Sequence, residues 1–278
     1  MINVPRIAII GGSGLYELLQ NPTHTFVDTP FGKTPRIEIG NIGGIEVAFL
    51  PRHSRPGNET VSHAIPPHKV NYRANIYGLM QLGVERILVS NAVGTLDPDL
   101  PPGNMCVVDQ FLDMTKEEPY TFYDGNTTIE LKDGRKVAGT VHIDVSQPFC
   151  PELRSVLLES ASKIGVPVRD GGVYVRTSGP RFETPAEINA FRILGATVVG
   201  MTAAPEAVLA RELELCYASI SMSTNFAAGM QQKISHEEVG VIFGQNIENV
   251  KKILREAVHL IPKEKSCPCP LALAGATA

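Results

Sequence analysis

Short apolar runs alternate with longer amphipathic segments along the chain, a pattern typical of an α/β protein. The apolar, β-branched runs that predict strands are 6–10, 45–50, 86–90, 105–108, 172–175 and 216–223. Helices are predicted at 69–82, 151–163, from Pro185 onward, 205–215 and 236–260. No repeat or composition shift divides the chain. We therefore predict an α/β fold: a single domain over residues 1–262, with a central mixed, twisted sheet flanked by helices.

The remaining segments predict loops and a tail. Residues 54–67 and 116–137 are polar or rich in glycine and proline, which favours surface loops. Residues 263–278 form the expected C-terminal tail, and its last part, from Ser266, is predicted to be loose. Hydrophobic residues make up 43% of the 278 residues, which is enough for a substantial core.

Charge and hydropathy exclude some partners. The net charge is −4 and the pI is near 6.0, whereas a general nucleic-acid binder is usually basic. No segment is apolar for long enough to span a bilayer, and the N-terminus lacks the layout of a signal peptide. We expect a soluble, cytoplasmic protein with no nucleic-acid or membrane partner.

The five cysteines divide into two groups. Cys106, Cys150 and Cys216 each stand alone in apolar surroundings, which favours buried structural thiols. Cys267 and Cys269 are separated by one proline, and a local disulfide, a bridge to another chain and two free thiols all stay open. A zinc site needs about four ligands, and no second pair accompanies this one, so no metal is predicted.

Residues 175–187 place a Gly-Pro turn, a cation, an aromatic ring and a carboxylate close together. A turn presents side chains outward, so a flat ring can stack on Phe182 and offer its edge to Glu183. Asn225 adds an amide just after the apolar run 216–223. A carboxylate and an amide together can read a ring that carries both an N–H and a carbonyl, as the edge of a 6-oxopurine does.

Polar residues also gather where the predicted strands end. Gly11-Gly-Ser-Gly14 follows the first strand; it is no P-loop, and it is a poor dinucleotide fingerprint because Glu17 replaces the third glycine. Arg52-His53 follows the second strand, and Asn91-Ala92 and Met201-Thr202 end two more runs. Ligands of open α/β sheets bind at the carboxyl ends of strands, so these anion donors together predict a phosphate site.

A series of motifs runs from the first strand to the last third of the chain. They are Ile10-Gly-Gly-Ser-Gly-Leu15, Pro51-Arg-His-Ser-Arg55, Val70-Asn-Tyr-Arg-Ala-Asn75, Ser90-Asn-Ala-Val-Gly94, Asp109-Gln-Phe-Leu-Asp113, Phe122-Tyr-Asp-Gly125, Gln147-Pro-Phe-Cys-Pro151, Gly179-Pro-Arg-Phe182, Gly200-Met-Thr202 and Pro205-Glu-Ala-Val-Leu-Ala210. In this order the chain resembles the trimeric branch of the purine nucleoside phosphorylases, on its methylthioadenosine phosphorylase side.

The resemblance implies phosphorolysis: a purine nucleoside and phosphate give free purine and ribose 1-phosphate, with no metal or organic cofactor. The phosphate shell it implies is Ser13, Arg52, His53, Asn91, Ala92 and Thr202. The substrate residues it implies are Met201 under the ribose, Phe182 on the base, Glu183, Asn225 and Ala227 near the base edge, and His236 at the 5′-hydroxyl. Asn225 and His53 are the candidate catalytic residues, since a hydrogen bond from Asn225 to the departing base strengthens in the transition state.

The resemblance also implies a homotrimer or a hexamer. His142 would reach the 5′ pocket of a neighbouring subunit, with Phe149 in the same donated segment. Residues 56–61 resemble an insertion before His63, and no role follows for them.

Two departures from the methylthioadenosine branch concern the base. That branch has serine at the place of Glu183 and an Asp-x-Asp at the place of Asn225 to Ala227. Glu183 can accept from the N1–H of a 6-oxopurine and Asn225 can donate to O6 or N7, which favours inosine and guanosine. Phosphorolysis of methylthioadenosine or methylthioinosine, and a non-enzymatic purine-binding protein, are the alternatives.

Overall fold

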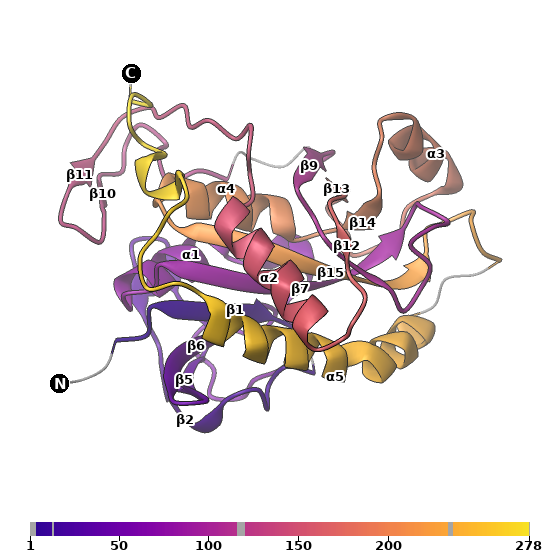
Figure 1. Ribbon diagram of the computed structural model, residues 1–278. Coiled ribbons are helices and arrows are strands. Elements are labelled where there is room, and N and C mark those ends of the chain that lie inside the picture. Colours follow the sequence, from indigo (N-terminus) through magenta and orange to yellow (C-terminus); the bar gives the residue numbers. More distant parts are fainter. Residues whose placement is uncertain (1–3, 13, 116–119, 233–235, 278) are drawn as a thin grey trace.

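One large mixed sheet organises the computed structural model, which describes residues 4–12, 14–115, 120–232 and 236–277 (Figure 1). The strand order is β12-β8-β15-β7-β1-β6-β5-β2, and β14, β13 and β9 continue from β7. Strands β1, β6, β7 and β15 are parallel to their neighbours in this group, whereas β15–β8, β7–β14, β5–β6 and β2–β5 are antiparallel. The predicted mixed sheet in one α/β domain is therefore confirmed.

The strands are β1 (Ile7–Gly11), β2 (Gln20–Thr25), β3 (Asp28–Thr29), β4 (Gly32–Lys33), β5 (Ile37–Ile42), β6 (Ile45–Pro51), β7 (Arg86–Thr95), β8 (Met105–Val107), β9 (Gln110–Asp113), β10 (Ile129–Glu130), β11 (Lys136–Val137), β12 (Arg169–Asp170), β13 (Val173–Arg176), β14 (Val198–Gly200) and β15 (Cys216–Phe226). The helices are α1 (Tyr72–Gln81), α2 (Pro151–Lys163), α3 (Pro185–Ile193), α4 (Ala203–Glu212) and α5 (His236–Leu260), with short 3-10 turns η1 (Pro67–Lys69) and η2 (Cys269–Leu271).

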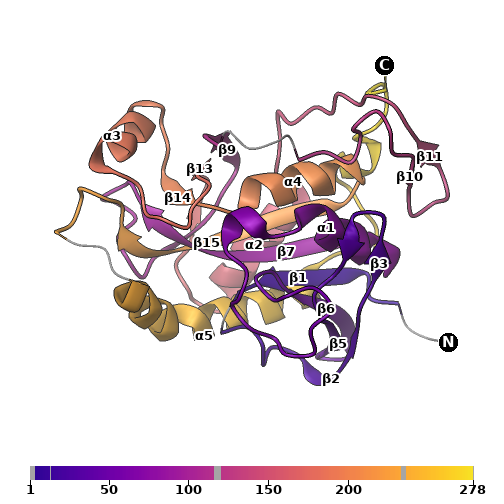
Figure 2. The ribbon, with the colours of Figure 1, turned by 180° about the vertical axis from the view of Figure 1, so that it is seen from behind.

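Helices cover both faces of the sheet. Helices α2 and α5 pack together on one face (Figure 1), and α1 and α4 pack together on the other (Figure 2). Strand β1 is buried on both faces, which accounts for its continuous apolar sequence. Ala8 and Ile10 belong to the core under α1 and α4, whereas Ile7 and Ile9 belong to the core under α2 and α5. Alternate side chains of a strand point to opposite faces, so a strand covered on both sides has no polar position.

Most predicted elements are present with shifted ends. Helix α1 begins at Tyr72 because the side chain of Asn71 caps it, accepting from the backbone N–H of Ala74. Strand β2, which the hydrophobic pattern did not predict, has the polar sequence QNPTHT. It pairs only with β5 at the border of the sheet, where proline and solvent-exposed polar residues are tolerated.

The long predicted helix 236–260 is confirmed as α5. Ile253, Leu254 and Val258 are buried against the sheet, but Val241, expected on the same apolar side, is 53% exposed. The apolar stripe is therefore buried only toward the C-terminal half of α5, while the side chain of Val239 lies outside the described residues.

The C-terminal segment is not loose, contrary to the prediction. Cys269 and Leu273 are buried, and the backbone N–H of His142 donates to the carbonyl of Ala276. The expectation that Cys150 and Cys216 stand alone is also wrong, since both meet Cys267 and Cys269. Sequence spacing could not reveal this meeting, because the four residues come from three distant segments.

Among the described residues, none of the helices is both long enough and apolar enough to cross a bilayer.

Candidate active site

Predicted anion donors meet around the start of α4. Arg52 directly follows β6, and its backbone N–H donates to the carbonyl of Gly11 at the end of β1 (3.1 Å). Thr202 is the N-cap residue of α4, and its hydroxyl donates to Oδ1 of Asn91 in β7 (2.9 Å). The end of β1 is thus joined to the residue after β6, and the start of α4 is joined to β7, which runs past Asn91 to Thr95, beyond the predicted strand 86–90. Ser13 lies outside the described residues.

Ala92 marks an opening beside Asn91. Every other residue of β7 is buried, whereas Ala92 is exposed. A small side chain there leaves the strand accessible in the middle of an otherwise covered sheet, which suits close approach of a ligand.

A buried ion pair holds the guanidinium of Arg52. Its Nε and Nη2 donate to the two carboxylate oxygens of Glu206 (2.5 and 3.0 Å), and the hydroxyl of Tyr217 donates to the same carboxylate (2.8 Å). Burial alone would lower the pKa of Arg52, but the charge of Glu206 raises it above its usual value, so the guanidinium stays cationic. Glu206 was not predicted from the sequence. A lone acid within the apolar run 203–210 was the available signal, because a buried carboxylate needs a partner.

His53 is held as a neutral ring. Its Nδ1 lies 2.8 Å from the carbonyl of Ile65, and its ring stacks on His63 with centroids 4.1 Å apart. Burial and the nearby charges of Arg52 and His63 lower the pKa of His53 to about 3. A carbonyl only accepts, so Nδ1 carries the hydrogen and Nε2 is left as an acceptor.

The loop after His53 is closed by its own hydrogen bonds. The hydroxyl of Ser54 donates to the carbonyl of Ser62 (3.0 Å) and accepts from the backbone N–H of Ser62 (2.9 Å). The exposed residues 55–60 therefore lie within a loop whose two ends are joined.

The carboxylate of Glu183 is oriented by Thr177, which was not predicted from the sequence. Glu183 is only 9% exposed, and its Oε1 accepts from the hydroxyl of Thr177 (2.7 Å), just beyond β13. Phe182 beside it is 38% exposed, so its ring is available for stacking. Gly179 has a φ of 62°, and a Cβ there would come within 2.4 Å of the sulfur of Met201. Only glycine lets this turn lie against Met201.

A β-bulge places Asn225. The pairing of β15 with β7 shifts register between Ser223 and Asn225, and such bulges re-aim side chains next to functional sites. Oδ1 of Asn225 accepts from the hydroxyl of Thr224 (3.0 Å), and Nδ2 donates to the carbonyl of Phe226 (2.9 Å).

The chain after β15 returns toward Glu183. Ala227 is buried, and a Cβ on Gly229 would come within 2.7 Å of the side chain of Pro185. Since Pro185 stands two residues after Glu183, the chain that follows Asn225 packs against the start of α3, directly after the Glu183 turn.

The two residues expected to face a neighbouring subunit differ in exposure. His142 is exposed and lines a cavity of about 450 Å³ with Gln147, Arg211 and Leu271. Phe149 is 2% exposed and lies near the rings of its own chain's Phe111 and Tyr217. The expectation that Phe149 is donated to a neighbour is therefore wrong. Helix α5 begins at His236, but the side chain of His236 lies outside the described residues.

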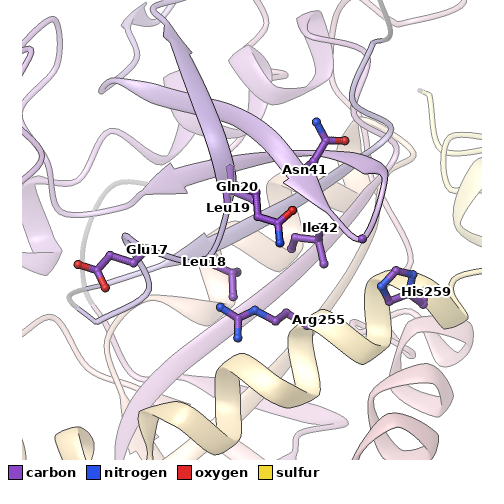
Figure 3. Close-up of a pocket in the computed structure, with 9 residues that line it drawn as sticks. Glu17, Leu18, Leu19, Gln20, Asn41, Ile42, Arg255 and His259 are labelled. Carbon is purple, nitrogen blue, oxygen red and sulfur yellow. The ribbon is translucent and has the colours of Figure 1, made fainter.

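A smaller cavity of about 180 Å³ lies apart from these residues, between the β2–β5 corner and α5 (Figure 3). Glu17, Asn41, Arg255 and His259 are among the residues that line it, and none of the predicted site residues is. It therefore makes no contribution to the site predicted from the sequence.

The sequence and the fold agree with a known family. Residues 6–259 match the model described as the phosphorylase superfamily, and the chain belongs to that superfamily. The chain is 52% identical over 271 residues, 96% of its length and 97% of the relative's, to a probable 6-oxopurine nucleoside phosphorylase of Korarchaeum cryptofilum. It is 49% identical over 276 residues, 99% of its length and the whole of the relative's, to the 6-oxopurine nucleoside phosphorylase of Pyrococcus furiosus.

Methylthioadenosine phosphorylases are also similar. The protein of this name from Pyrococcus abyssi is 44% identical over 267 residues, 96% of each chain. Among solved structures, a methylthioadenosine phosphorylase from an antarctic soil metagenomic library matches with a TM-score of 0.87 and 34% identity, covering 99% of this chain and 93% of that one.

The neutral state of His53 predicts a pH-dependent stability. The unfolded chain binds a proton on this ring near pH 6.5, whereas the folded chain does so only near pH 3. In phosphate-free buffer, the unfolding free energy should therefore fall as pH decreases from 6.5 toward 3, by about 1.4 kcal/mol per pH unit for this one proton.

Urea denaturation between pH 7 and 4.5 measures this slope. His53→Asn should flatten it by about one proton, whereas His68→Asn, at an exposed position, should leave it unchanged. Parallel curves for wild type and His53→Asn would show that the folded protein binds the proton at an ordinary pH.

Proposed function

We propose that the protein is a purine nucleoside phosphorylase that cleaves 6-oxopurine nucleosides, such as inosine and guanosine, with phosphate to free purine and ribose 1-phosphate. The observation that carries this proposal is that the chain keeps a buried carboxylate, Glu183, and a buried amide, Asn225, within the fold of the phosphorylase superfamily. The 6-oxopurine nucleoside phosphorylases that match nearly the whole chain support it.

Phosphate would bind where the donors of β6, β7 and α4 meet. Glu206 takes Nε and Nη2 of Arg52, so Nη1 remains for an anion. The hydroxyl of Thr202 and the amide of Asn91 are further polar groups there, and the acceptor Nε2 of neutral His53 suits a protonated phosphate oxygen. Ser13 and the backbone at Ala92 complete the proposed shell.

The chemistry needs only these groups and the substrate. The glycosidic bond loosens toward an oxocarbenium-like ribosyl cation, which the bound phosphate attracts and then captures. Negative charge grows on the departing purine. Nδ2 of Asn225 carries two hydrogens and uses one on Phe226, so the other can donate to N7 or O6, and this bond strengthens as charge develops.

The base edge explains the preference. Because Thr177 donates to Oε1 of Glu183, the carboxylate is held as an acceptor, which matches the N1–H of a 6-oxopurine. Adenine has an unprotonated N1, so it would leave two acceptors facing each other. Unpaired buried polar groups give strong discrimination. Phe182 would stack on the base and Met201 would lie under the ribose.

A 5′-methylthio nucleoside is the second candidate substrate. The similarity to methylthioadenosine phosphorylases favours it, both in sequence and in the solved structure with a TM-score of 0.87. Methylthioinosine has the same base as inosine and would make the same contacts with Glu183 and Asn225. Initial rates with inosine, guanosine, adenosine, methylthioadenosine and methylthioinosine therefore identify the preferred 5′ group. A purely binding role fits less well, since Arg52, His53 and Thr202 of the implied phosphate shell are all present and buried.

Base release should depend strictly on phosphate or arsenate. The double variant Arg52→Gln/Glu206→Gln removes the charge without leaving a buried carboxylate unpaired. It should raise the KM for phosphate by about 10- to 150-fold, because a charge-assisted hydrogen bond contributes about 1.5–3 kcal/mol.

Initial rates over a phosphate series measure this effect, with Arg135→Gln as the exposed control. Undiminished base release without phosphate would identify a hydrolase instead. An unchanged KM in the double variant would remove Arg52 from the phosphate shell.

Inosine and guanosine should have a higher kcat/KM than adenosine. Asn225→Asp should shift the ratio toward adenosine by about 1–3 kcal/mol, or roughly 5- to 150-fold, because a carboxylate accepts from the 6-amino group. Asn58→Asp, in the exposed loop, is the control. Equal use of adenosine and inosine by the wild type would contradict the proposed reading of the base edge.

We further propose a homotrimer or a hexamer in which His142 contacts the 5′ pocket of a neighbouring subunit. The exposure of His142, at a cavity open on its own chain, supports an outside partner. Sedimentation should give a closed oligomer, and His142→Ala should raise the KM for nucleoside without changing the KM for phosphate. A fully active monomer would exclude this role for His142.

A further inference from the structure

The peptide group between Met201 and Thr202 is held at both of its polar atoms by side chains of one strand. Nε of Arg176 donates to the carbonyl of Met201 (3.3 Å). The backbone N–H of Thr202 donates to the hydroxyl oxygen of Tyr174 (3.0 Å). Tyr174 and Arg176 are alternate residues of β13, so their side chains lie on the same face of the sheet and reach one peptide group together.

A glycine makes room for the hydroxyl of Tyr174. Gly200 is the last residue of β14, and a Cβ there would come within 2.2 Å of this hydroxyl oxygen. Its φ lies outside the left-handed region, so the need for space, rather than for backbone freedom, accounts for the glycine. A larger residue at position 200 would push the ring of Tyr174 away from the N–H of Thr202.

The two side chains that hold the peptide group are themselves fixed. Tyr174 is fully buried, and Arg176 is 1% exposed. Nη1 of Arg176 donates to the carboxylate of Asp113 (3.2 Å) and to the hydroxyl of Thr115 (2.9 Å). The guanidinium also lies over the ring of Tyr120, 5.0 Å from its centroid. These contacts balance the charge of Arg176 and keep its planar group from turning away from the peptide group.

The two residues joined by this peptide group have different tasks in the proposed function. Met201 would lie under the ribose, and Thr202 would donate to phosphate. In the reaction, a phosphate oxygen forms a bond to C1′ of the ribose as the bond from C1′ to the purine breaks. The distance and angle between the two reactants therefore depend on how this peptide group is oriented.

We propose that Tyr174 and Arg176 are positioning residues, which fix the Met201–Thr202 peptide group and thereby align the bound phosphate with the ribose. The inference rests on the proposed function. Neither residue is a catalytic residue, because both are buried behind the peptide group that they hold.

Tyr174→Phe removes the hydroxyl oxygen and keeps the ring. The buried N–H of Thr202 then loses this acceptor, and the peptide group can rotate toward another one. The kcat/KM for phosphate should fall about 10- to 100-fold, through a lower kcat and a higher KM for phosphate. The preference for inosine over adenosine should stay unchanged, because Glu183 and Asn225 are held by other contacts.

Tyr77→Phe is the matched control. Tyr77 is 5% exposed, and its hydroxyl donates to the carbonyl of Glu130 in β10 (3.3 Å). This change also removes one hydroxyl from a buried ring, but away from the predicted site residues. Thermal denaturation should show a similar loss of stability in both variants. At a temperature well below both transitions, Tyr77→Phe should keep the kcat and the KM values of the wild type.

Arg176→Lys tests the other side of the peptide group. Lysine keeps the buried positive charge opposite Asp113, but it replaces a planar group that reaches Asp113 and Met201 at once with a single ammonium. It should lower kcat as Tyr174→Phe does. Because both side chains hold one peptide group, the double variant should lose less activity than the product of the two single losses.

Three results would overturn the proposal. The first is a wild-type kcat and KM for phosphate in Tyr174→Phe. The second is an equal loss of activity in Tyr174→Phe and Tyr77→Phe, which would assign the hydroxyl to stability alone. The third is a double variant whose loss equals the product of the single losses. Failure of the proposed function would look different, because the wild type itself would then show no phosphate-dependent release of base.

Discussion

The buried pair of Arg52 and Glu206 is the interaction on which this edge of the molecule depends. A guanidinium with 3% exposure is tolerated only because the carboxylate of Glu206 meets it, and the hydroxyl of Tyr217 donates in turn to that carboxylate. Those three residues come from the end of β6, from α4 and from β15, so the pair fixes how a helix sits over the strand ends. Glu206 balances the charge of Arg52, while Nη1 of the cationic guanidinium remains for an anion beside a neutral histidine, hydroxyls and amides.

Much of the fold follows from local pattern. Continuous apolar runs such as 7–11 could be recognised because both faces of the central strands are covered, and Pro151 and Pro185 marked helix starts through their fixed φ. Strand β2 could not be recognised, because its pairing depends on β5 rather than on its own residues. The packed C-terminal segment escaped for the same reason: Cys269 and Leu273 look isolated in sequence and gain their partners only from distant segments.

Within the candidate site, the residues that would touch ligands were more readily predicted than those that orient them. Arg52 follows β6, Thr202 caps α4 and Asn91 follows the apolar run 86–90 within β7, and hydrogen bonds join Thr202 to Asn91 and Arg52 to the end of β1. Thr177 and Glu206 were missed, because a hydroxyl or an acid that faces inward has no distinctive spacing. The bulge that directs Asn225 was equally invisible, since its register depends on β7 as well as on β15.

The hydrogen bonds between Ser54 and Ser62 have a consequence for how this chain can vary. They close the loop at its base, and the carbonyl of His53 is separately held by the backbone N–H groups of Ala64 and Ile65. A change in the length of the segment between Ser54 and Ser62 should therefore not displace the imidazole of His53. This loop can therefore accept insertions, labels or tethers. A single residue inserted near the C-terminal end of β15, by contrast, would shift its register with β7 and turn the side chain of Asn225 to the other face of the sheet.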